Sequence, residues 1–183
     1  KGDFFYLFSG FIYQLLKIIK TENLSFSFED KRTPINIIIP DDDIIRNIIP
    51  RFTLYPHQIQ AIKVMLKNKI CIIKAIMSAG KTILAAAFLK ILNQPFLFLV
   101  NKKSLAEQTF IEFNKFGLEC GVNYSGKKIM KESMISTIGS VYKIPNLSDI
   151  KILILDESHH CSSKTYQNFL KSFLVPIRIG LSA

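Results

Sequence analysis

Apolar runs alternate with segments of helical periodicity along the chain from Arg51 to Ala183. Strands and helices in alternation are the sign of a parallel sheet with helices on its faces. We therefore expect an α/β fold. The expected strands are residues 70–74, 95–100, 134–138, 151–155 and 177–181, and the expected helices are residues 81–92, 104–116 and 166–173.

Three segments of this pattern lead to more specific expectations. The helix that follows Pro56 has an apolar face formed by Ile59, Ile62, Met65 and Leu66. Residues 70–74 are mostly β-branched, which predicts a short buried strand. Residues 126–131 are basic and have no clear period, which indicates a loop.

Residues 1–50 follow a different pattern. We expect a strand at 4–8, a helix at 11–20 and, from alternating apolar and polar residues, a half-buried strand at 24–28. Three aspartates at 41–43 then cap a short helix that ends near Pro50. This is a small α+β accessory module without a set of residues that suggests catalysis. A structural or docking role is therefore favoured over direct substrate recognition, and residues 51–183 form the main domain.

Composition narrows the class of partner. The 183 residues carry a formal net charge of +10, which suits a polyanion such as nucleic acid, although a lysine- and asparagine-rich composition is also what an AT-rich genome produces. No apolar run reaches the roughly 18 residues that span a bilayer, so no membrane partner is expected. The three cysteines form no C-x-x-C pair, which favours a reducing compartment such as the cytoplasm.

The first chemical motif follows the strand at 70–74. A loop that ends in Gly80-Lys81-Thr82 joins this strand to an Ala/Leu-rich helix, which is the order that a phosphate-binding P-loop requires. Loop N–H groups and the helix N-terminus attract an anion, Lys81 reaches the β- and γ-phosphates, and the Thr82 hydroxyl binds Mg²⁺. Ala75 replaces the usual first glycine, as is common in one group of nucleic-acid motor ATPases. The predicted ATP-binding residues of the loop are Ser78, Ala79, Gly80, Lys81 and Thr82.

The second chemical motif is Asp156-Glu157, directly after the apolar run 152–155. Ligands of open α/β sheets bind beyond the carboxyl ends of the strands, which is also where a P-loop lies. We expect Asp156 to hold Mg²⁺ and Glu157 to orient and deprotonate the attacking water. The sequence thus predicts ATP and Mg²⁺ as cofactors.

These motifs carry a resemblance to a known family. Asp156-Glu157-Ser158-His159 matches the D-E-x-H box of superfamily 2 helicases and translocases. Four further signatures of that family occur in the same order: Tyr55-Pro56-His57-Gln58 resembles the adenine-reading element, residues 98–108 motif Ia, residues 134–140 motif Ib and residues 180–183 the start of motif III. The chain departs from the family at Asn101, where proline is usual, and at Gly139, where glutamine is frequent. The resemblance covers residues 51–183 and implies the first RecA-like domain of a P-loop NTPase.

The resemblance also implies roles for single residues. Gln58 would read adenine through two hydrogen bonds. The catalytic residues would be Lys81, Asp156, Glu157 and His159, and His159 would also couple the nucleotide site to Ser182 of motif III. The residues that would contact the sugar-phosphate backbone of one strand are Lys102, Lys103, Ser104 and Thr137, and Lys127 and Lys128 could add to that path. The alternative for these lysines is an ordinary solvated surface.

The layout of residues 1–50 resembles the segment that precedes the motor in phage UvsW-type recombination helicases. That resemblance implies a parent protein that remodels branched DNA during recombination or repair, in the cytoplasm of a bacterium or of a phage-infected host.

The expected function is therefore the N-terminal part of an ATP-dependent DNA helicase or translocase, acting on single-stranded or branched DNA. Such motors close two RecA-like domains over ATP, and the second domain supplies arginine fingers worth about 10³–10⁵ in rate in related systems. Because this chain ends before a second domain, we expect it to be nearly inactive alone. The alternatives are a translocating subunit of a restriction enzyme, a nucleic-acid-binding module that has lost catalysis, and a P-loop ATPase that is not a helicase.

Overall fold

The computed structural model describes residues 12–23, 25, 36–75, 80–159 and 163–182. The chain forms two compact units, Lys1–Thr33 and Pro34–Ala183. In the first unit the structure describes helix α1 (Ile12–Thr21), which confirms the helix expected at 11–20. The strand expected at 4–8, and that at 24–28 except for Ser25, lie outside the described residues.

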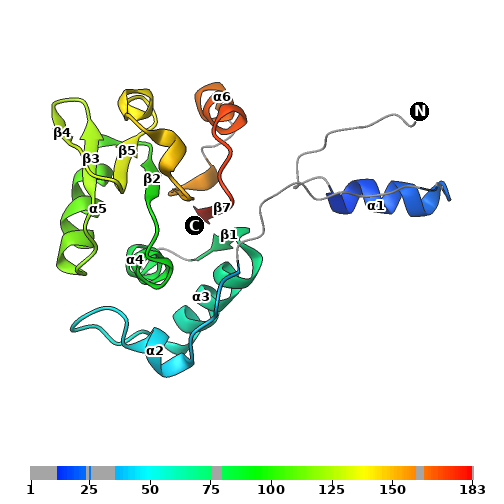
Figure 1. Ribbon diagram of the computed structural model, residues 1–183, viewed down its shortest axis with the longest axis horizontal. Coiled ribbons are helices and arrows are strands. Elements are labelled where there is room, and N and C mark those ends of the chain that lie inside the picture. Colours follow the sequence, from blue (N-terminus) through cyan, green and yellow to red (C-terminus); the bar gives the residue numbers. More distant parts are fainter. Residues whose placement is uncertain (1–11, 24, 26–35, 76–79, 160–162, 183) are drawn as a thin grey trace. The chain divides into compact units, whose positions relative to one another are not determined.

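The second unit is built on a sheet of seven described strands in the order β1-β7-β6-β2-β5-β3-β4 (Figure 1). All neighbouring strands are parallel except β3 and β4, which are antiparallel. The strands are β1 (Ile70–Lys74), β2 (Phe96–Val100), β3 (Gly121–Tyr124), β4 (Lys127–Ile129), β5 (Met134–Thr137), β6 (Ile152–Leu155) and β7 (Ile177–Ser182). The carboxyl ends of β1, β7, β6, β2, β5 and β3 therefore lie along one edge of the sheet.

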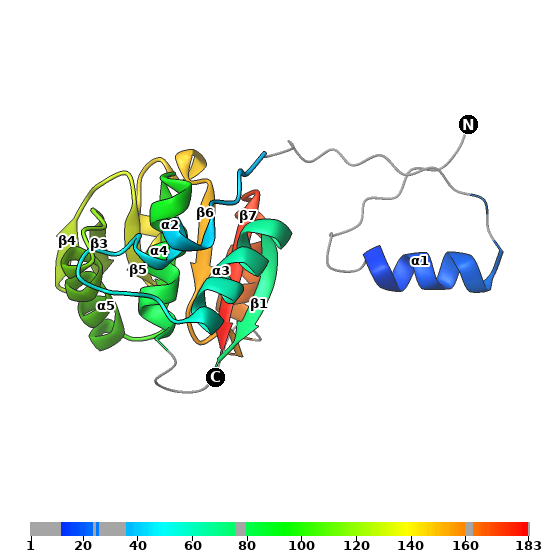
Figure 2. The ribbon, with the colours of Figure 1, turned by 90° about the horizontal axis from the view of Figure 1, so that it is seen from below.

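Helices cover both faces of this sheet. One face packs against α3 (Pro56–Asn68), α4 (Lys81–Leu92) and α5 (Lys103–Lys115), and the other against α6 (Lys164–Ser172) and the segment 141–150 (Figures 1 and 2). β2 and β6 are buried along their whole length, as parallel strands between two layers of helices must be. The expected α/β fold is thereby confirmed, and so is the buried apolar face of α3.

Strand β1 differs from the prediction. We expected it to be buried, but its residues alternate between exposed and half-buried, and Ile72 is 71% exposed. The reason is its place at the edge of the described sheet, where β7 is its one neighbour. Cys71 and Ile73 pack against the core beneath α3, whereas Ile70 and Ile72 point to the opposite face. The prediction of a buried strand was wrong because an apolar sequence does not reveal how many neighbours a strand has.

The segment expected as a loop at 126–131 also differs, since β4 occupies part of it. β4 pairs with β3 through the two-residue turn Ser125-Gly126, in which Gly126 has a φ of +95°. A three-residue strand is too short to show a period of two in the sequence. At the start of this hairpin, a Cβ on Gly121 would overlap the carbonyl oxygen of Ile129, so glycine permits the close pairing.

The boundary between the units falls earlier than the pattern of residues 1–50 suggests. Helix α2 (Asp42–Arg46) packs on α3, with an ion pair between Asp42 and Lys63. Ile45 and Ile49 are buried in the same core as α3 and α4. The described residues 36–50 therefore share the core of the α/β unit.

Phe113 offers a test of the packing between α5 and the sheet. Its ring is fully buried, in edge-to-face contact with Phe96 and Phe98 at centroid distances of 6.1 and 5.2 Å. We expect Phe113→Ala to lower the free energy of unfolding by about 3–5 kcal/mol, because it leaves a cavity between helix and sheet. Ile111→Ala, on the exposed side of the same helix, should change it far less. Urea unfolding measures both, and equal losses would contradict this packing.

Candidate active site

The residues of the two chemical motifs meet at the carboxyl edge of the sheet, beyond β1, β7 and β6. The Ala75 N–H, just after β1, donates to the carbonyl oxygen of Ser182 at 2.9 Å. Asp156 follows β6, and its N–H donates to the carbonyl oxygen of Leu99 at 2.9 Å. These backbone bonds fix the ends of three strands, from which the P-loop, the acidic pair and Ser182 emerge.

Gly80 is the last residue before α4 and lies against Gln58. It has a φ of +76°, a conformation that glycine adopts without strain. A Cβ at this position would lie 2.6 Å from Gln58 Nε2 and 3.0 Å from Ile83 Cγ2. The backbone conformation therefore favours glycine here, and a larger residue would also displace the buried Gln58 side chain that α3 brings next to Gly80.

Gln58 also has a structural role that the sequence did not predict. Its Oε1 accepts a hydrogen bond from the backbone N–H of Tyr55 at 2.9 Å and so caps the first turn of α3. Pro56 at the start of the helix makes this kind of N-terminus favourable. Adenine reading through both amide atoms stays a prediction, and it is compatible with this cap because an amide oxygen has two lone pairs.

Lys81, Glu157, His159 and Ser182 form a chain of polar contacts. Lys81 Nζ lies 3.2 Å from Glu157 Oε1, and His159 Nδ1 lies 3.3 Å from Glu157 Oε2. Ser182 Oγ lies 3.5 Å from the same His159 nitrogen. Glu157 is half-buried, so its charge is less screened than that of a surface carboxylate. These three contacts link Lys81, at the end of the P-loop, to Ser182 of β7 through the proposed catalytic carboxylate of Glu157.

Asp156 and Glu157 are held in different ways. Asp156 Oδ1 accepts a hydrogen bond from the Glu157 N–H at 3.0 Å. Burial raises the pKa of Asp156, partly offset by that hydrogen bond and by the charge of Lys81. Glu157 has a φ of +50°, a left-handed conformation that is uncommon for residues other than glycine and that clusters at functional sites. It turns the chain sharply after β6, with Ser158 lying close to Gly180 of β7.

The described residues fit ATP and Mg²⁺. Helix α4 begins at Lys81 and has no acidic residue in its first turn, so the N–H groups at its N-terminus favour an anion there. Thr82 lies in the same turn. Burial disfavours the negative charge of Asp156 when no cation balances it, so this carboxylate is suited to a bound cation such as Mg²⁺. Ser78 and Ala79 lie outside the described residues.

The residues predicted to contact nucleic acid lie on the other half of the same edge. Lys102, Lys103 and Ser104 follow β2 and are exposed at the start of α5. Thr137 ends β5 and pairs in register with Val100 at the end of β2. The sheet thus brings these four residues together, separated from the P-loop by the strands β6 and β7.

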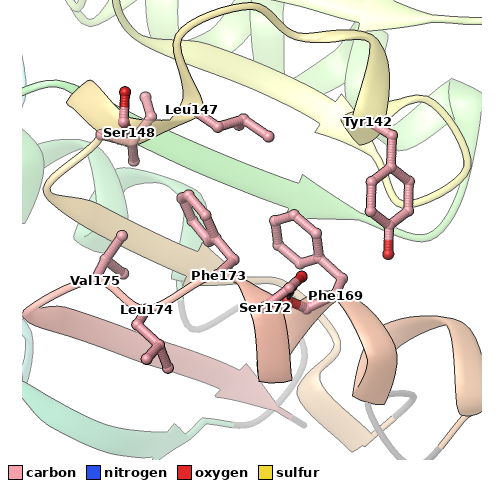
Figure 3. A pocket seen from close by; sticks show the side chains of 9 residues that line it. Tyr142, Leu147, Ser148, Phe169, Ser172, Phe173, Leu174 and Val175 are labelled. Carbon is pink, nitrogen blue, oxygen red and sulfur yellow. Dashed lines mark hydrogen bonds between the residues drawn. The ribbon is translucent and has the colours of Figure 1, made fainter.

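An apolar pocket lies apart from both sets of residues. It has a volume of about 410 Å³ and lies between the segment 141–150 and α6, lined by side chains such as Leu147, Phe169 and Val175 (Figure 3). It holds none of the predicted site residues. Among the described residues, no helix is both long and apolar enough to cross a membrane.

Comparison with known proteins identifies a family and individual proteins that this chain resembles in sequence. Residues 51–183 match the family described as "Type III restriction enzyme, res subunit". The chain is 33% identical over 171 residues to "Probable helicase D10" of Escherichia phage T5, which covers 91% of this chain and 36% of the phage protein. It is 31% identical over 136 residues to "DNA 3'-5' translocase XPB2" of Sulfurisphaera tokodaii, which covers 73% of this chain and 31% of the archaeal protein. The chain thus spans about a third of the length of these relatives.

Solved structures show the same fold at lower identity. The UvsW helicase of bacteriophage T4 superposes with a TM-score of 0.77 at 18% identity, covering 94% of this chain and 70% of that one. The SWI2/SNF2 ATPase core of Sulfolobus solfataricus, solved in complex with double-stranded DNA, gives a TM-score of 0.58 at 22% identity, covering 71% of this chain and 32% of that one. These likenesses confirm the RecA-like fold.

Gly80→Ala tests the contact between the P-loop and Gln58. The new methyl group would strain a backbone with a φ of +76° and displace the Gln58 amide, so we expect nucleotide affinity to fall about tenfold, equivalent to about 1.4 kcal/mol. Gly139→Ala is the control, because a Cβ there meets nothing within 4 Å. Titration with a fluorescent ATP analogue measures both, and unchanged affinity in Gly80→Ala would contradict the described geometry.

Proposed function

The chain belongs to the superfamily 2 helicases, through the family described as type III restriction enzyme, res subunit, and on this premise we propose that it is the N-terminal part of an ATP-dependent DNA helicase or translocase. It contributes the first RecA-like domain. The observation that carries the proposal is the convergence of Lys81, Asp156 and Glu157 at the carboxyl ends of β1 and β6. A phosphate-binding cation, a metal-binding carboxylate and a candidate base meet there in the order that ATP hydrolysis needs.

Each residue of the site then has a task. Mg²⁺, when bound, neutralises charge on the phosphate oxygens. Asp156 holds the metal together with Thr82, and Lys81 pairs with the β- and γ-phosphates. Glu157 accepts a proton from the attacking water. Since Lys81 contacts Glu157 Oε1 at 3.2 Å, the movement of Lys81 to the phosphates would release that oxygen, while His159 still contacts Oε2.

The polar contacts from Lys81 to Ser182 also support a route that couples the nucleotide site to β7. His159 contacts both Glu157 and Ser182, so a movement of the carboxylate during hydrolysis reaches β7 directly. Ser182 is the last residue of β7. We propose that this contact passes the state of the nucleotide to the segment that follows β7.

The partners are proposed on the same basis. Relatives named as a helicase and as a DNA translocase support DNA as the substrate, either single-stranded or branched. Because ATP hydrolysis in this superfamily takes place between two RecA-like domains, a second domain in the same parent chain completes the site. The proposed location is the cytoplasm of a bacterium or of a phage-infected host, in keeping with the phage relative.

A second candidate function is favoured by the description of the matching family. A translocating subunit of a restriction enzyme would use the same ATP site and the same first domain. A nuclease domain in the parent protein would identify this alternative. A nucleic-acid-binding module without catalysis is not favoured, because Lys81, Asp156 and Glu157 are all present and lie together.

Lys81→Ala should abolish ATP turnover by the parent protein, because it removes the cation that pairs with the phosphates. Lys67→Ala, an exposed lysine near the end of α3, is the matched control and should leave turnover unchanged. A coupled phosphate-release assay measures both. Normal turnover in Lys81→Ala would overturn the P-loop assignment.

Glu157→Gln should keep ATP binding and slow hydrolysis by about 10²–10⁴-fold, the typical contribution of a general base. Glu132→Gln, on an exposed stretch before β5, is the control and should change neither property. Equilibrium binding and single-turnover hydrolysis separate the two steps. Loss of binding in Glu157→Gln would assign the carboxylate to metal or structure instead.

The deciding experiment is ATP turnover by the parent protein with and without single-stranded and branched DNA. Strong stimulation, greatest with branched DNA, supports a junction-remodelling motor. Turnover that is indifferent to nucleic acid would leave the ATP site standing and overturn the helicase proposal.

A further inference from the structure

We infer that the uncovered side of β1 and β7 receives the segment that follows Ser182 in the parent protein. This segment crosses it as a helix that places a carboxylate beside Arg178, and then pairs as a strand with β1. The inference rests on the proposed function, because it concerns a parent chain that continues past residue 183. The relatives support such a chain, since the matched part is 36% of the phage protein and 31% of the archaeal protein.

The uncovered side follows from the alternation of side chains in the two strands. Ile179 and Leu181 of β7 are buried in the same core as α3 and α4. Arg178 therefore points to the opposite side of the sheet, where it lies in register with Ile70 of β1. On that side Ile70 is 39% exposed and Ile72 is 71% exposed. We call the surface formed by Ile70, Ile72 and Arg178 the β1–β7 face.

Strand β1 also has an open edge in the described sheet (Figure 2). The backbones of Lys69 and Ala75 bond to β7. Successive residues of a strand direct their backbone groups alternately to its two sides, so those of Ile70, Ile72 and Lys74 point away from β7. An apolar edge strand with unpaired N–H and C=O groups is a template for pairing with another strand.

The handedness of the crossovers determines which side of the sheet the next segment crosses. From β1 to β2 and from β2 to β3 the chain passes over the α3 side, through α4 and α5. From β6 to β7 it moves in the opposite direction along the sheet and passes over the other side, through α6. A crossover from β7 to the open edge of β1 continues in this second direction. Because about 98% of such crossovers are right-handed, it passes over the β1–β7 face.

Arg178 determines the charge that fits this face. Its Nη2 donates to the carbonyl oxygen of Phe173 at 3.2 Å, and its Nε donates to that of Val175 at 3.3 Å. In the described part of the chain it forms no ion pair. Burial lowers the pKa of Arg178, so an anion beside the guanidinium would stabilise its charge. A helix with one carboxylate and an otherwise apolar face satisfies the remaining guanidinium donors and covers the isoleucines.

The test is hydrogen exchange of the β1 amides in the parent protein, measured at single-residue resolution. The outward amides, those of Ile72 and Lys74, should exchange at least about 100-fold more slowly than in an open strand, because a neighbouring strand binds them. The amides of Cys71 and Ile73 face β7 and are the internal control, since they are protected in either case. Outward amides that exchange as in an open strand would overturn the inference.

Arg178→Met tests the carboxylate. It should lower the protection of the outward amides at least about tenfold, because it leaves the carboxylate of the covering helix without a cation. The amides that face β7 should keep their protection, which a general loss of structure would not allow. Arg178→Lys restores the charge and should restore most of the protection. Arg51→Met, which removes an exposed arginine before α3, is the matched control and should change nothing. Equal protection in Arg178→Met and the wild type would overturn the assigned ion pair.

The outcomes separate this inference from the proposed function. ATP turnover that DNA stimulates, together with unprotected outward amides, would overturn the inference and leave the helicase proposal intact. Protected outward amides in a parent protein without ATP turnover would support the inference and overturn the motor. Protection that rises with protein concentration would assign the edge to a second copy of the chain and overturn the inference.

Discussion

The parallel pairing of β1, β7 and β6 is the constraint on which the site depends. It brings the ends of three strands that are far apart in sequence to one edge, where the backbone of Ala75 bonds to that of Ser182. Parallel strands require crossover connections, and here those connections are the helices that bury the sheet on both faces. The same packing that stabilises the domain therefore positions Lys81, Asp156 and Glu157.

The backbone conformations of two residues help to place the side chains of the site. Gly80 and Glu157 both have positive φ angles, and each lies where the chain turns sharply at the carboxyl edge. At Gly80 the turn lets the P-loop approach Gln58, and at Glu157 it directs the carboxylate toward Lys81. A left-handed glutamate is strained, and such strain persists only when surrounding contacts compensate for it. Here Lys81 and His159 contact the two carboxylate oxygens.

Strand order divides the carboxyl edge between two kinds of chemistry. The half at β1, β7 and β6 carries the residues that fit a nucleotide, and the half at β2, β5 and β3 carries exposed lysines. Hydrogen bonds cross the boundary, since Asp156 bonds to Leu99 at the end of β2. A rigid sheet thus connects the proposed ATP site to the proposed nucleic-acid surface without a flexible linker between them.

Local sequence determined much of this protein. Hydrophobic periodicity predicted α3, α4, α5 and the core strands, and the motifs at 75–82 and 156–159 predicted which residues would lie near one another. These features depend on neighbours within a few positions, so a single sequence contains them. Tertiary structure alone decided the exposure of β1 at the sheet edge, the β3–β4 hairpin and the capping role of Gln58. It also placed Arg178 of β7 beside the exposed Ile70 of β1. These features depend on which segments become neighbours in space, and that is set by strand order and packing rather than by any local pattern.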